Sequence, residues 1–377
     1  MKEILFIYYQ NIKQGGVSKA ITNVSRNLVD EGFNVTILFL QREHMDFFPI
    51  DNRIKKIYID SFETPYFRKA HQINKKSIFK GKLLKLVYYA YDYGCYKVLK
   101  NWIEKNHKDY DVIVTCWYKL SIFLTYTTAA NKTLAWDHID HRVGGVIYYN
   151  LLRKRYVKLA GIICLTEVSL NYYSRIHFNI IKIPNIIDAH YENSEFTLEY
   201  KINSILFAGR LEQEKNVIEF IEIINEIELP EDWSVTIAGS GGEAAKIEAY
   251  TKHLGLLEKV QFVGQISAEE VAELLKKSKI LCMTSRREGL PTILIEAMFC
   301  GNALVSYDCP TGPSEIINEN NGFLIPLRNK RLFKEKLNYL IHNPLSLSKL
   351  MQSSYKESYQ WRKDEIVKKW KYILSDL

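Results

Sequence analysis

The sequence lacks any run of about 18 apolar residues, the length that a helix needs to cross a membrane. It also lacks the features of a secretory signal. Met1-Lys2-Glu3 leads directly into the strand-like run 4–9 rather than into a longer apolar stretch with a small-residue cleavage site. Both absences argue against a spanning helix and against secretion, so we expect a cytoplasmic protein.

Paired cysteines are missing as well. The six cysteines include no C-x-x-C pair, and most lie inside apolar strand-like or helix-like runs. Zinc sites and disulfide frameworks rest on regularly spaced cysteines, so neither is expected. The pattern is typical of a reducing compartment, and we expect no bound metal and no other cofactor.

The composition indicates a folded chain with two domains and an uneven charge. Hydrophobic residues make up 47% and charged residues 25%, which excludes a disordered or low-complexity chain. A length of 377 residues predicts two domains of roughly 180 residues each. Residues 1–183 hold 28 Lys and Arg against 15 Asp and Glu, a net charge of +13, and the remainder holds 23 against 28, a net charge of −5. The first half is therefore expected to face membrane headgroups, a phosphorylated substrate or nucleic acid.

Apolar runs alternate with helical patterns along the whole chain. In the first half a strand-like run is followed by a loop, a helix with apolar spacing over 17–28 and a second strand at 34–40, the order that a parallel sheet with crossover helices requires. The sequence therefore predicts the α/β class, with two doubly wound, Rossmann-like domains. Further strands are expected at 112–116, 133–136, 161–165, 180–183, 204–208, 234–238, 260–263, 280–284, 303–306 and 323–325.

We predict domains at 1–184 and 185–355, with the boundary near Pro184-Asn185 and a polar linker over Asp188–Lys201. Residues 356–377 are expected to end in a helix with apolar spacing. That helix could cap its own domain or cross back onto the first.

Two carboxylates, Glu288 and Glu296, flank seven residues after a predicted strand. Pro291 suits the first helical position, which places Glu288 on the preceding loop and Glu296 in the helix. A separation of about 12 Å is too wide for a glycosidase pair, but it fits a ligand with two polyol groups. The amides of Gly289 and Leu290 would meet an anion there. A helix cap at Glu288 and a surface ion pair at Glu296 explain the pattern equally well.

Arg210 and Lys215 follow the predicted strand 204–208, at the edge where open α/β sheets bind ligands. Two such cations can compensate the charge of a diphosphate without a metal. Alternatively, Glu212 and Glu214 pair with these cations in a solvated turn.

Glycine-rich turns follow two other predicted strands, at Gly15-Gly16 and at 239–242. Glycine allows a backbone to approach a ligand closely, but the dinucleotide fingerprint G-x-G-x-x-G is absent. An ordinary tight turn explains both segments more simply.

Aspartate and histidine are concentrated in Trp136–Arg142. They could bind a metal, act as acid and base, or orient a hydroxyl group, and a hydrogen-bonded polar loop explains them equally well. Metal binding is the weaker interpretation because no third cluster of ligands is visible.

The segment 62–102 is rich in Tyr, Phe and Lys, and residues 153–155 add further basic charge. Such a segment fits a helix at a membrane surface, or a core helix with a solvated lysine face. Nucleic acid would also be attracted, but no recognised binding motif accompanies the charge.

Taken together, these features resemble the retaining, metal-independent glycosyltransferases of family 4 (glycosyl transferases group 1), which have the GT-B fold, and in particular their bacterial polysaccharide and lipid-linked glycan type. The resemblance covers nearly the whole chain and is most specific between Pro184 and Glu315. The matching segments are 288–296 for E-x7-E, 209–216 for G-R-x-x-x-x-K-N, 262–264 for F-x-G, 184–188 for P-N-G-I-D with Ile186 in place of Gly, and 308–315 for a G-P-S-E variant.

The resemblance implies a role for each matching residue. Arg210 and Lys215 would clamp the donor diphosphate, and Glu296 would hold the ribose hydroxyls. Glu288 and the two amides after it would face the donor sugar and the β-phosphate. The implied catalytic residues are Glu288, His138, Arg210 and Lys215. The implied donor contacts are Gly16, Arg210, Lys215, Gly239, Val263, Glu288, Gly289, Leu290 and Glu296.

The resemblance implies a hexosyltransferase-type enzyme. It would move a sugar from a nucleoside-diphosphate sugar, uridine-linked by family frequency, to a hydroxyl of a glycan or lipid-linked glycan. An anionic membrane surface is a further expected partner of the first domain, at the inner face of the plasma membrane, and nucleic acid is not. The rival hypotheses are a nucleotide-sugar epimerase and a non-catalytic membrane-binding module. A nicotinamide oxidoreductase is weaker because the glycine fingerprint is missing.

Asp109-Tyr110-Asp111 matches D-x-D, a metal–nucleotide signature of another class of sugar transferases. Because it directly precedes the apolar strand 112–116, we interpret it as the polar start of that strand.

Overall fold

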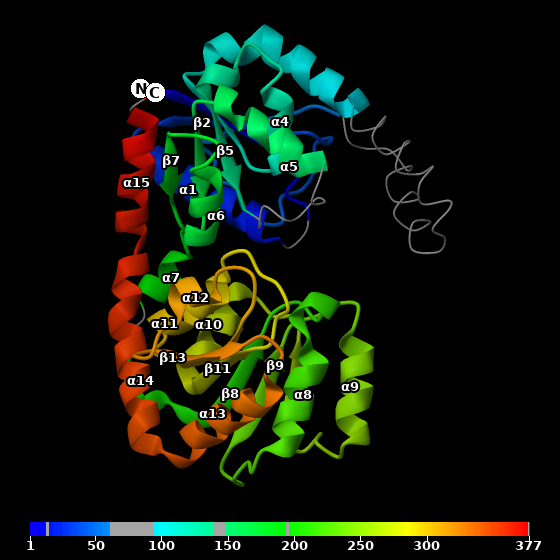
Figure 1. Ribbon diagram of the computed structural model, residues 1–377, viewed down its shortest axis with the longest axis vertical. Helices are drawn as coiled ribbons and strands as arrows, with labels where there is room; N and C mark the ends of the chain where they lie inside the picture. The colour runs from blue at the N-terminus through cyan, green and yellow to red at the C-terminus, as the bar shows by residue number, and fades with distance from the viewer. Residues whose placement is uncertain (13–14, 61–92, 139–147, 194–195, 376) are drawn as a thin grey trace. The chain divides into compact units, whose positions relative to one another are not determined.

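The computed structural model of the chain describes residues 1–12, 15–60, 93–138, 148–193, 196–375 and 377. The chain divides into two compact units. The first comprises Met1–Cys164, Ser169–Ile183 and Val367–Leu377, and the second comprises Leu165–Val168 and Pro184–Ile366. Each unit is built around its own parallel sheet (Figure 1).

The first unit contains a seven-stranded sheet in the order β3-β2-β1-β4-β5-β6-β7, and every neighbouring pair is parallel. The order reverses between β1 and β4, which is the switch point of a doubly wound sheet. The strands are β1 (Glu3–Tyr8), β2 (Asn34–Phe39), β3 (Lys55–Tyr58), β4 (Val112–Thr115), β5 (Thr133–Asp137), β6 (Gly161–Cys164) and β7 (Ile180–Lys182).

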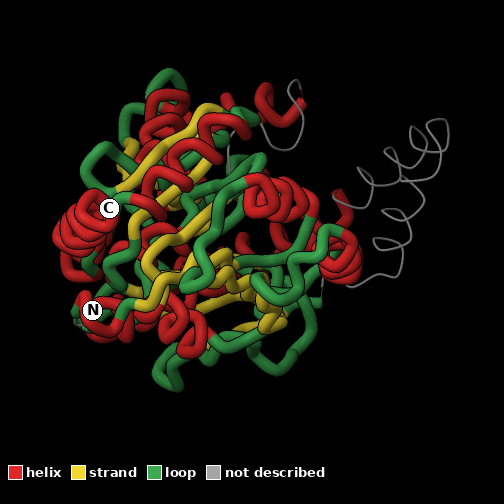
Figure 2. The backbone as a smooth tube through the Cα atoms, turned by 90° about the horizontal axis from the view of Figure 1, so that it is seen from below, coloured by secondary structure: helices red, strands yellow, loops and turns green. Residues whose placement is uncertain are grey.

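Helices connect these strands, except for β2 and β3, which are joined by the non-helical segment 40–54. Figure 2 shows helices on either side of the strands. They include α1 (Gly16–Asp30), a helix over 93–106, α4 (Tyr118–Leu124), α5 (Tyr148–Arg153) and α6 (Glu167–Tyr173). In α1 the buried apolar residues are Ala20, Ile21, Val24 and Leu28, which all lie on the helix face that the sequence predicted to be apolar.

The second unit contains a six-stranded sheet in the order β10-β9-β8-β11-β12-β13, again parallel throughout. Its strands are β8 (Ile202–Ala208), β9 (Ser234–Ala238), β10 (Val260–Gly264), β11 (Ser278–Met283), β12 (Ala303–Asp308) and β13 (Gly322–Pro326). Its main helices are α8 (Val217–Glu226), α9 (Ala244–His253), α10 (Ala268–Lys277), α11 (Thr292–Phe299), α12 (Pro313–Ile316), α13 (Lys330–His342) and α14 (Pro344–Glu357). The predicted α/β class with two doubly wound sheets is confirmed.

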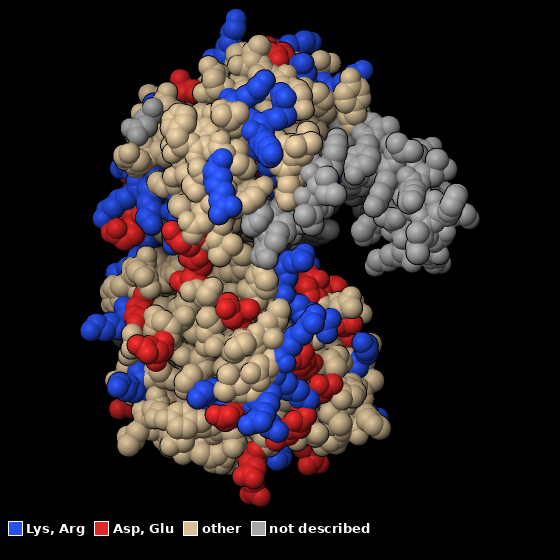
Figure 3. Space-filling view, in the orientation of Figure 1, with Lys and Arg blue, Asp and Glu red and all other residues tan. Residues whose placement is uncertain are grey.

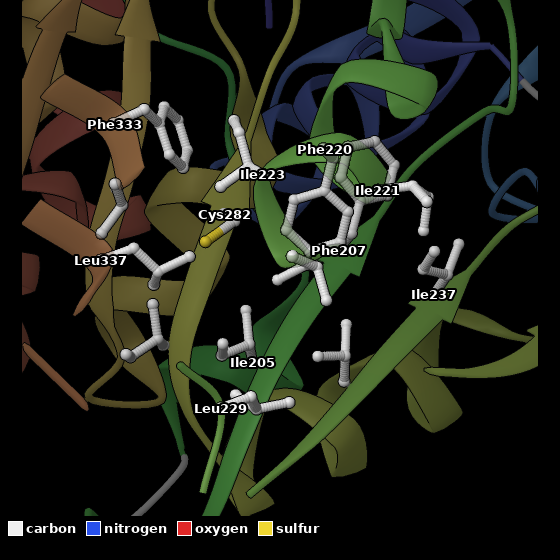
Figure 4. Close-up of a cluster of buried hydrophobic side chains, with 14 of the residues drawn as sticks. Ile205, Phe207, Phe220, Ile221, Ile223, Leu229, Ile237, Cys282, Phe333 and Leu337 are labelled. Carbon is white, nitrogen blue, oxygen red and sulfur yellow. The ribbon is translucent and has the colours of Figure 1, made fainter. Parts of the chain in front are cut away.

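The core of the second unit lies between one face of its sheet and helices α8 and α13 (Figure 4). The rings of Phe207 on β8 and Phe220 on α8 lie 5.5 Å apart between their centroids. Phe333 and Leu337 of α13 are fully buried in the same cluster. Each side chain of this size stabilises the fold by roughly 1.5–3 kcal/mol when it is fully buried.

The last helix, α15 (Lys363–Ser375), is shared between the units, because its residues from Val367 onward belong to the first. Trp370 is fully buried, 4.8 Å from the ring centroid of Trp136 and 6.1 Å from that of Phe6. The Lys2 ammonium donates to the carbonyl oxygen of Leu374 at 2.8 Å. The end of the chain is therefore part of the core of the first unit.

The predicted polar linker over Asp188–Lys201 is wrong, because this segment contains packed structure. A short helix, α7 (Ala189–Glu192), buries Tyr191, and Lys201 is buried as well. The Lys201 ammonium donates to the carbonyl oxygens of Leu275 and Ser278, at 2.8 and 2.7 Å, at the carboxyl end of α10. Burial lowers the pKa of Lys201 to about 7. A polar side chain of this segment, Lys201, thus caps the carboxyl end of α10. The polar composition of the segment does not reveal this packing role.

No helix within the described ranges combines the length and the apolar character that crossing a bilayer would need.

Candidate functional site

The carboxyl ends of β8, β9 and β10 meet through glycine-rich turns in close backbone contact. The Gly209 amide donates to the carbonyl oxygen of Ala238 at 2.9 Å, and the Gly239 amide donates to that of Gly264 at 2.7 Å. Gly239 has a φ of 143°, and a Cβ there would lie 1.8 Å from the carbonyl oxygen of Gly209. Glycine at 239 is therefore required by the fold itself. Val263, predicted with it as a donor contact, is half-buried near the end of β10.

Arg210 and Lys215 lie on the loop after β8, which ends in a short 3-10 turn over Gln213–Lys215. The Arg210 guanidinium is exposed and bonds to the Glu214 carboxylate at 2.9 Å. Lys215 instead crosses to another loop, where its ammonium lies 2.6 Å from Oε1 of Glu288, and both side chains are largely buried. The alternative of a solvated turn therefore holds for the Arg210–Glu214 pair but not for Lys215.

The loop that carries Glu288 is joined to the loop after β12. The Glu288 amide donates to the carbonyl oxygen of Pro310 at 2.9 Å, and the Thr311 amide donates to that of Glu288 at 3.0 Å. Gly312 has a φ of 99°, and a Cβ there would lie 2.3 Å from the carbonyl oxygen of Gly289. These contacts fix the backbone that precedes α11.

The amides of Gly289 and Leu290 donate no hydrogen bond within the described part of the chain. They immediately precede α11, which begins at Thr292 with Pro291 as its N-cap, one residue later than predicted. Unbonded amides at the start of a helix favour an anion. That they bind the donor phosphate, as the family resemblance implies, stays a prediction.

Glu296 lies within α11 and is 5% exposed, which excludes the predicted alternative of a surface ion pair. The buried Tyr191 hydroxyl forms a hydrogen bond with its carboxylate and also lies 3.4 Å from the carbonyl oxygen of Ala268. Burial, more than the neighbouring carboxylate, raises the pKa of Tyr191. Sequence reasoning missed Tyr191, because a lone tyrosine in a polar segment gives no periodic signal.

His138 follows β5 in the first unit and is 7% exposed. Its ring centroid lies 4.1 Å from that of Trp136, and its Nε2 atom has no hydrogen-bond partner in the described structure. Burial lowers the pKa of His138 to about 3, so the imidazole is neutral near pH 7. The rest of the predicted Asp/His segment, from Ile139 to Arg142, lies outside the described residues.

The residue before it, Asp137, is buried in a network that the sequence did not reveal. Hydroxyl groups of Tyr173 and Tyr156 donate to its carboxylate, the latter at 3.4 Å, and Nε of Arg153 lies 4.0 Å away. Burial is the largest influence and raises the pKa of Asp137, while these partners oppose the rise. The network fixes the end of β5, from which His138 follows.

Gly16 begins α1, and a Cβ there would meet no atom within 4 Å. Among the predicted residues of the second unit, the structure pairs Lys215 with Glu288. Gly16 and His138 belong to the first unit. Their part in the same site stays a prediction.

Two other predicted features have simpler outcomes. Asp111 of the D-x-D segment accepts a hydrogen bond from the Glu3 amide at 2.8 Å, as a polar start of β4 would. Within the described ranges, no group of three or more His, Cys, Asp or Glu side chains is arranged to hold a metal ion. Most of the basic and aromatic segment 62–102 lies outside the described residues, which resume at Tyr93.

Comparisons with known proteins agree with this architecture. Residues 192–361 match the model of the family described as glycosyl transferases group 1. The chain is 25% identical to the amylovoran biosynthesis glycosyltransferase AmsD of Erwinia amylovora over the full length of both. Over 180 residues it is 29% identical to the GalNAc-alpha-(1->4)-GalNAc-alpha-(1->3)-diNAcBac-PP-undecaprenol alpha-1,4-N-acetyl-D-galactosaminyltransferase of Campylobacter jejuni, covering 47% of this chain and 49% of the relative.

Among solved structures, that of a mutant of S. aureus TarM in complex with Fondaparinux, alpha-GlcNAc-glycerol and UDP matches with a TM-score of 0.75. Its sequence identity is 16%, and the match covers 99% of this chain and all of the other. The fold is that of the GT-B glycosyltransferases. The protein is a glycosyltransferase, as the sequence predicted.

Proposed function

We propose that the protein transfers a sugar, with retention of configuration and without a metal ion, from a UDP-sugar to a hydroxyl group of a glycan or lipid-linked glycan in cell-surface polysaccharide biosynthesis. The observation that carries this proposal is the Lys215–Glu288 pair, with 2.6 Å between ammonium and carboxylate, beside the unbonded amides of Gly289 and Leu290. Support for the acceptor comes from the relatives, whose names refer to amylovoran biosynthesis and to an undecaprenol-linked glycan.

In the proposed mechanism the leaving diphosphate is the group that gains charge. Arg210, Lys215 and the amino end of α11 would stabilise that charge without reorganising, which is the condition for electrostatic catalysis. Glu296 would hold the ribose hydroxyls. The anomeric carbon would pass through an oxocarbenium-like state. The acceptor hydroxyl would attack from the face that the diphosphate leaves, and its proton would pass to a phosphate oxygen.

Glu288 would face the donor sugar and orient the Lys215 ammonium, to which it is already paired. His138 would act as a neutral hydrogen-bonding group near the reacting sugar, because its buried imidazole is not protonated near neutral pH. An anionic membrane surface is a further proposed partner of the first unit, at the inner face of the plasma membrane. Its net positive sequence charge supports that assignment.

The proposal is tested by screening nucleoside-diphosphate sugars for nucleoside-diphosphate release, with and without a lipid-linked acceptor and with and without a metal chelator. We expect release that depends on acceptor and persists with the chelator. The product should keep the donor's anomeric configuration by NMR. An inverted product or a strict need for a divalent ion would contradict the mechanism, and donor isomerisation without acceptor would favour an epimerase.

Arg210→Ala should lower kcat/KM by about a hundredfold or more, because it removes a charge that compensates the leaving group. The matched control is Arg331→Ala, which removes an exposed arginine from α13 and should leave turnover unchanged. Equal kinetics for the two variants would remove Arg210 from the clamp.

A further inference from the structure

Four side chains beneath the Lys215 loop form a chain of hydrogen bonds that the proposed mechanism does not use. The Tyr307 hydroxyl on β12 donates to Oε1 of Glu219 at 2.5 Å. The other carboxylate oxygen of Glu219 accepts from the side-chain amide of Asn216. Nη2 of Arg286 donates to Oδ1 of Asn216 at 2.9 Å. These hydrogen bonds thus connect Tyr307, in the sheet of the second unit, to Asn216, the residue next to Lys215.

Asn216 has an unusual backbone that needs this support. Its φ of 55° and ψ of 43° lie in the left-handed region, which asparagine adopts more readily than most residues but less readily than glycine. It is 7% exposed, and both polar ends of its side chain are bonded. The Thr284 hydroxyl lies within hydrogen-bonding distance of two adjacent carbonyl oxygens, that of Lys215 at 3.1 Å and that of Asn216 at 3.2 Å. Side chain and backbone are therefore held in one conformation.

The turn at Asn216 sets the direction in which the chain enters α8 and leaves Lys215. The Arg286 amide donates to the carbonyl oxygen of Glu214 at 2.8 Å, so the loop is also fixed on its other side. Lys215 then spans the gap to Glu288 at 2.6 Å. Tyr307 is fully buried, and burial raises its pKa, so its hydroxyl keeps the proton that it donates.

We propose that Tyr307 is a positioning residue for the diphosphate clamp, acting through Glu219 and Asn216 on the Lys215 ammonium. The inference rests on the proposed function, because Lys215 must meet the donor phosphates for its placement to matter. Loss of the hydroxyl frees one end of the Glu219 carboxylate, relaxes its hold on Asn216 and lets Lys215 move away from Glu288.

The test compares a nucleoside with its diphosphate, because only the diphosphate contacts the clamp. Calorimetric titration with UDP and with uridine, in the full chain, separates the two. For Tyr307→Phe we expect about five- to tenfold weaker UDP binding, which lies within the range for one typical hydrogen bond, and unchanged uridine binding. Tyr339→Phe is the matched control. It removes a hydroxyl bonded to Ser346 at 2.9 Å, at the start of α14, and should change neither affinity.

A merely structural role for Tyr307 would weaken both ligands equally, and that result overturns the proposal. Glu219→Gln provides a second route should Tyr307→Phe fold poorly. Replacing a carboxylate oxygen by an NH2 group removes an acceptor of the same chain of bonds, and the same selective loss for UDP is expected. Unchanged UDP affinity in a folded Glu219→Gln variant overturns the proposal as well.

A double-mutant cycle tests the route through Asn216. Glycine in Asn216→Gly adopts the left-handed backbone conformation without side-chain hydrogen bonds. Alanine in Asn216→Ala also lacks these hydrogen bonds, and its Cβ disfavours that conformation. We expect Tyr307→Phe to have no further effect on UDP binding in the Asn216→Gly background, and Asn216→Ala to bind UDP more weakly than Asn216→Gly. Additive effects of Tyr307→Phe and Asn216→Gly overturn the proposal.

Binding of UDP and uridine to the wild-type protein distinguishes a failure of the diphosphate clamp from a failure of the positioning role of Tyr307. Wild-type protein that binds UDP no better than uridine contradicts the proposed diphosphate clamp and this inference together. Preferential UDP binding by wild-type protein, with equal UDP affinity in Tyr307→Phe, overturns the positioning role alone.

Discussion

A buried histidine that stays neutral makes the free energy of unfolding depend on pH. His138 is packed against Trp136, and burial holds its pKa at about 3, well below its ordinary value near 6.5. As pH falls below 6.5, the unfolded chain binds a proton at this residue and the folded chain does not. The free energy of unfolding therefore falls as the pH is lowered from about 6.5 to 3 because of His138.

We predict that the free energy of unfolding falls between pH 7 and pH 5 by about 1–2 kcal/mol more in the wild-type protein than in His138→Leu. Denaturant unfolding at the two pH values measures this difference. His253→Leu, which replaces an exposed histidine on α9, serves as the control and should behave as wild type. The same pH dependence in wild type and His138→Leu would show that the imidazole is not held neutral.

At the scale of single residues, the sequence predicted that Arg210 and Lys215 follow a strand, and they do follow β8, but it did not predict their contacts. Arg210 pairs with Glu214, one of its predicted neighbours, because four residues of sequence separation suffice for that contact. Lys215 pairs with Glu288, 73 residues away. That contact depends on the pairing of β8 with β11 and on the loop after β12, which no local pattern encodes.

At the scale of elements, strand positions were predictable because parallel strands buried on both faces are continuous apolar runs. β9 matches its prediction, and the other predicted strands agree within two residues at each end. β3 was missed because it lies at the sheet edge and begins with the exposed Lys55 and Lys56, a polar pattern that hides a strand. The segment of α7 was missed for a similar reason, since its one buried tyrosine lies among polar residues.

The last helix offers a test at this scale. Trp370→Ala should lower the free energy of unfolding of the first unit by about 3–5 kcal/mol, because it leaves a cavity against Trp136 and Phe6. Tyr372→Ala, two residues along α15, removes a side chain that is 65% exposed and should cost less than about 1 kcal/mol. Thermal unfolding followed by tryptophan fluorescence compares the two, and equal shifts would contradict the packing role of Trp370.

At the scale of the whole molecule, the charge found in the sequence is visible on the surface. On the face shown in Figure 3, the first unit carries mainly Lys and Arg, whereas the second mixes both signs. Aromatic rings accompany this charge in the first unit. The Arg155 guanidinium lies 3.7 Å from the ring centroid of the exposed Tyr126, whose ring contacts that of Tyr96. Basic and aromatic side chains together favour the interface of an anionic bilayer.

We therefore predict that the protein binds vesicles of phosphatidylcholine and phosphatidylglycerol more tightly than vesicles of phosphatidylcholine alone, and that added salt weakens the binding. Lys154→Glu, an exposed change on the first unit, should reduce binding about tenfold or more. Lys349→Glu makes the same change in α14 of the second unit and should have little effect. Equal losses for both variants would assign the attraction to net charge and not to this surface.

Because α15 ends within the first unit, that unit is assembled from segments that lie before and after the second unit in the sequence. A ribosome reaches Trp370 only after it has synthesised the second unit, so the first unit cannot complete its core before then. A polypeptide that stops near residue 183 should expose Trp136 and Phe6 and aggregate, and adding a peptide with the sequence of α15 should restore its solubility.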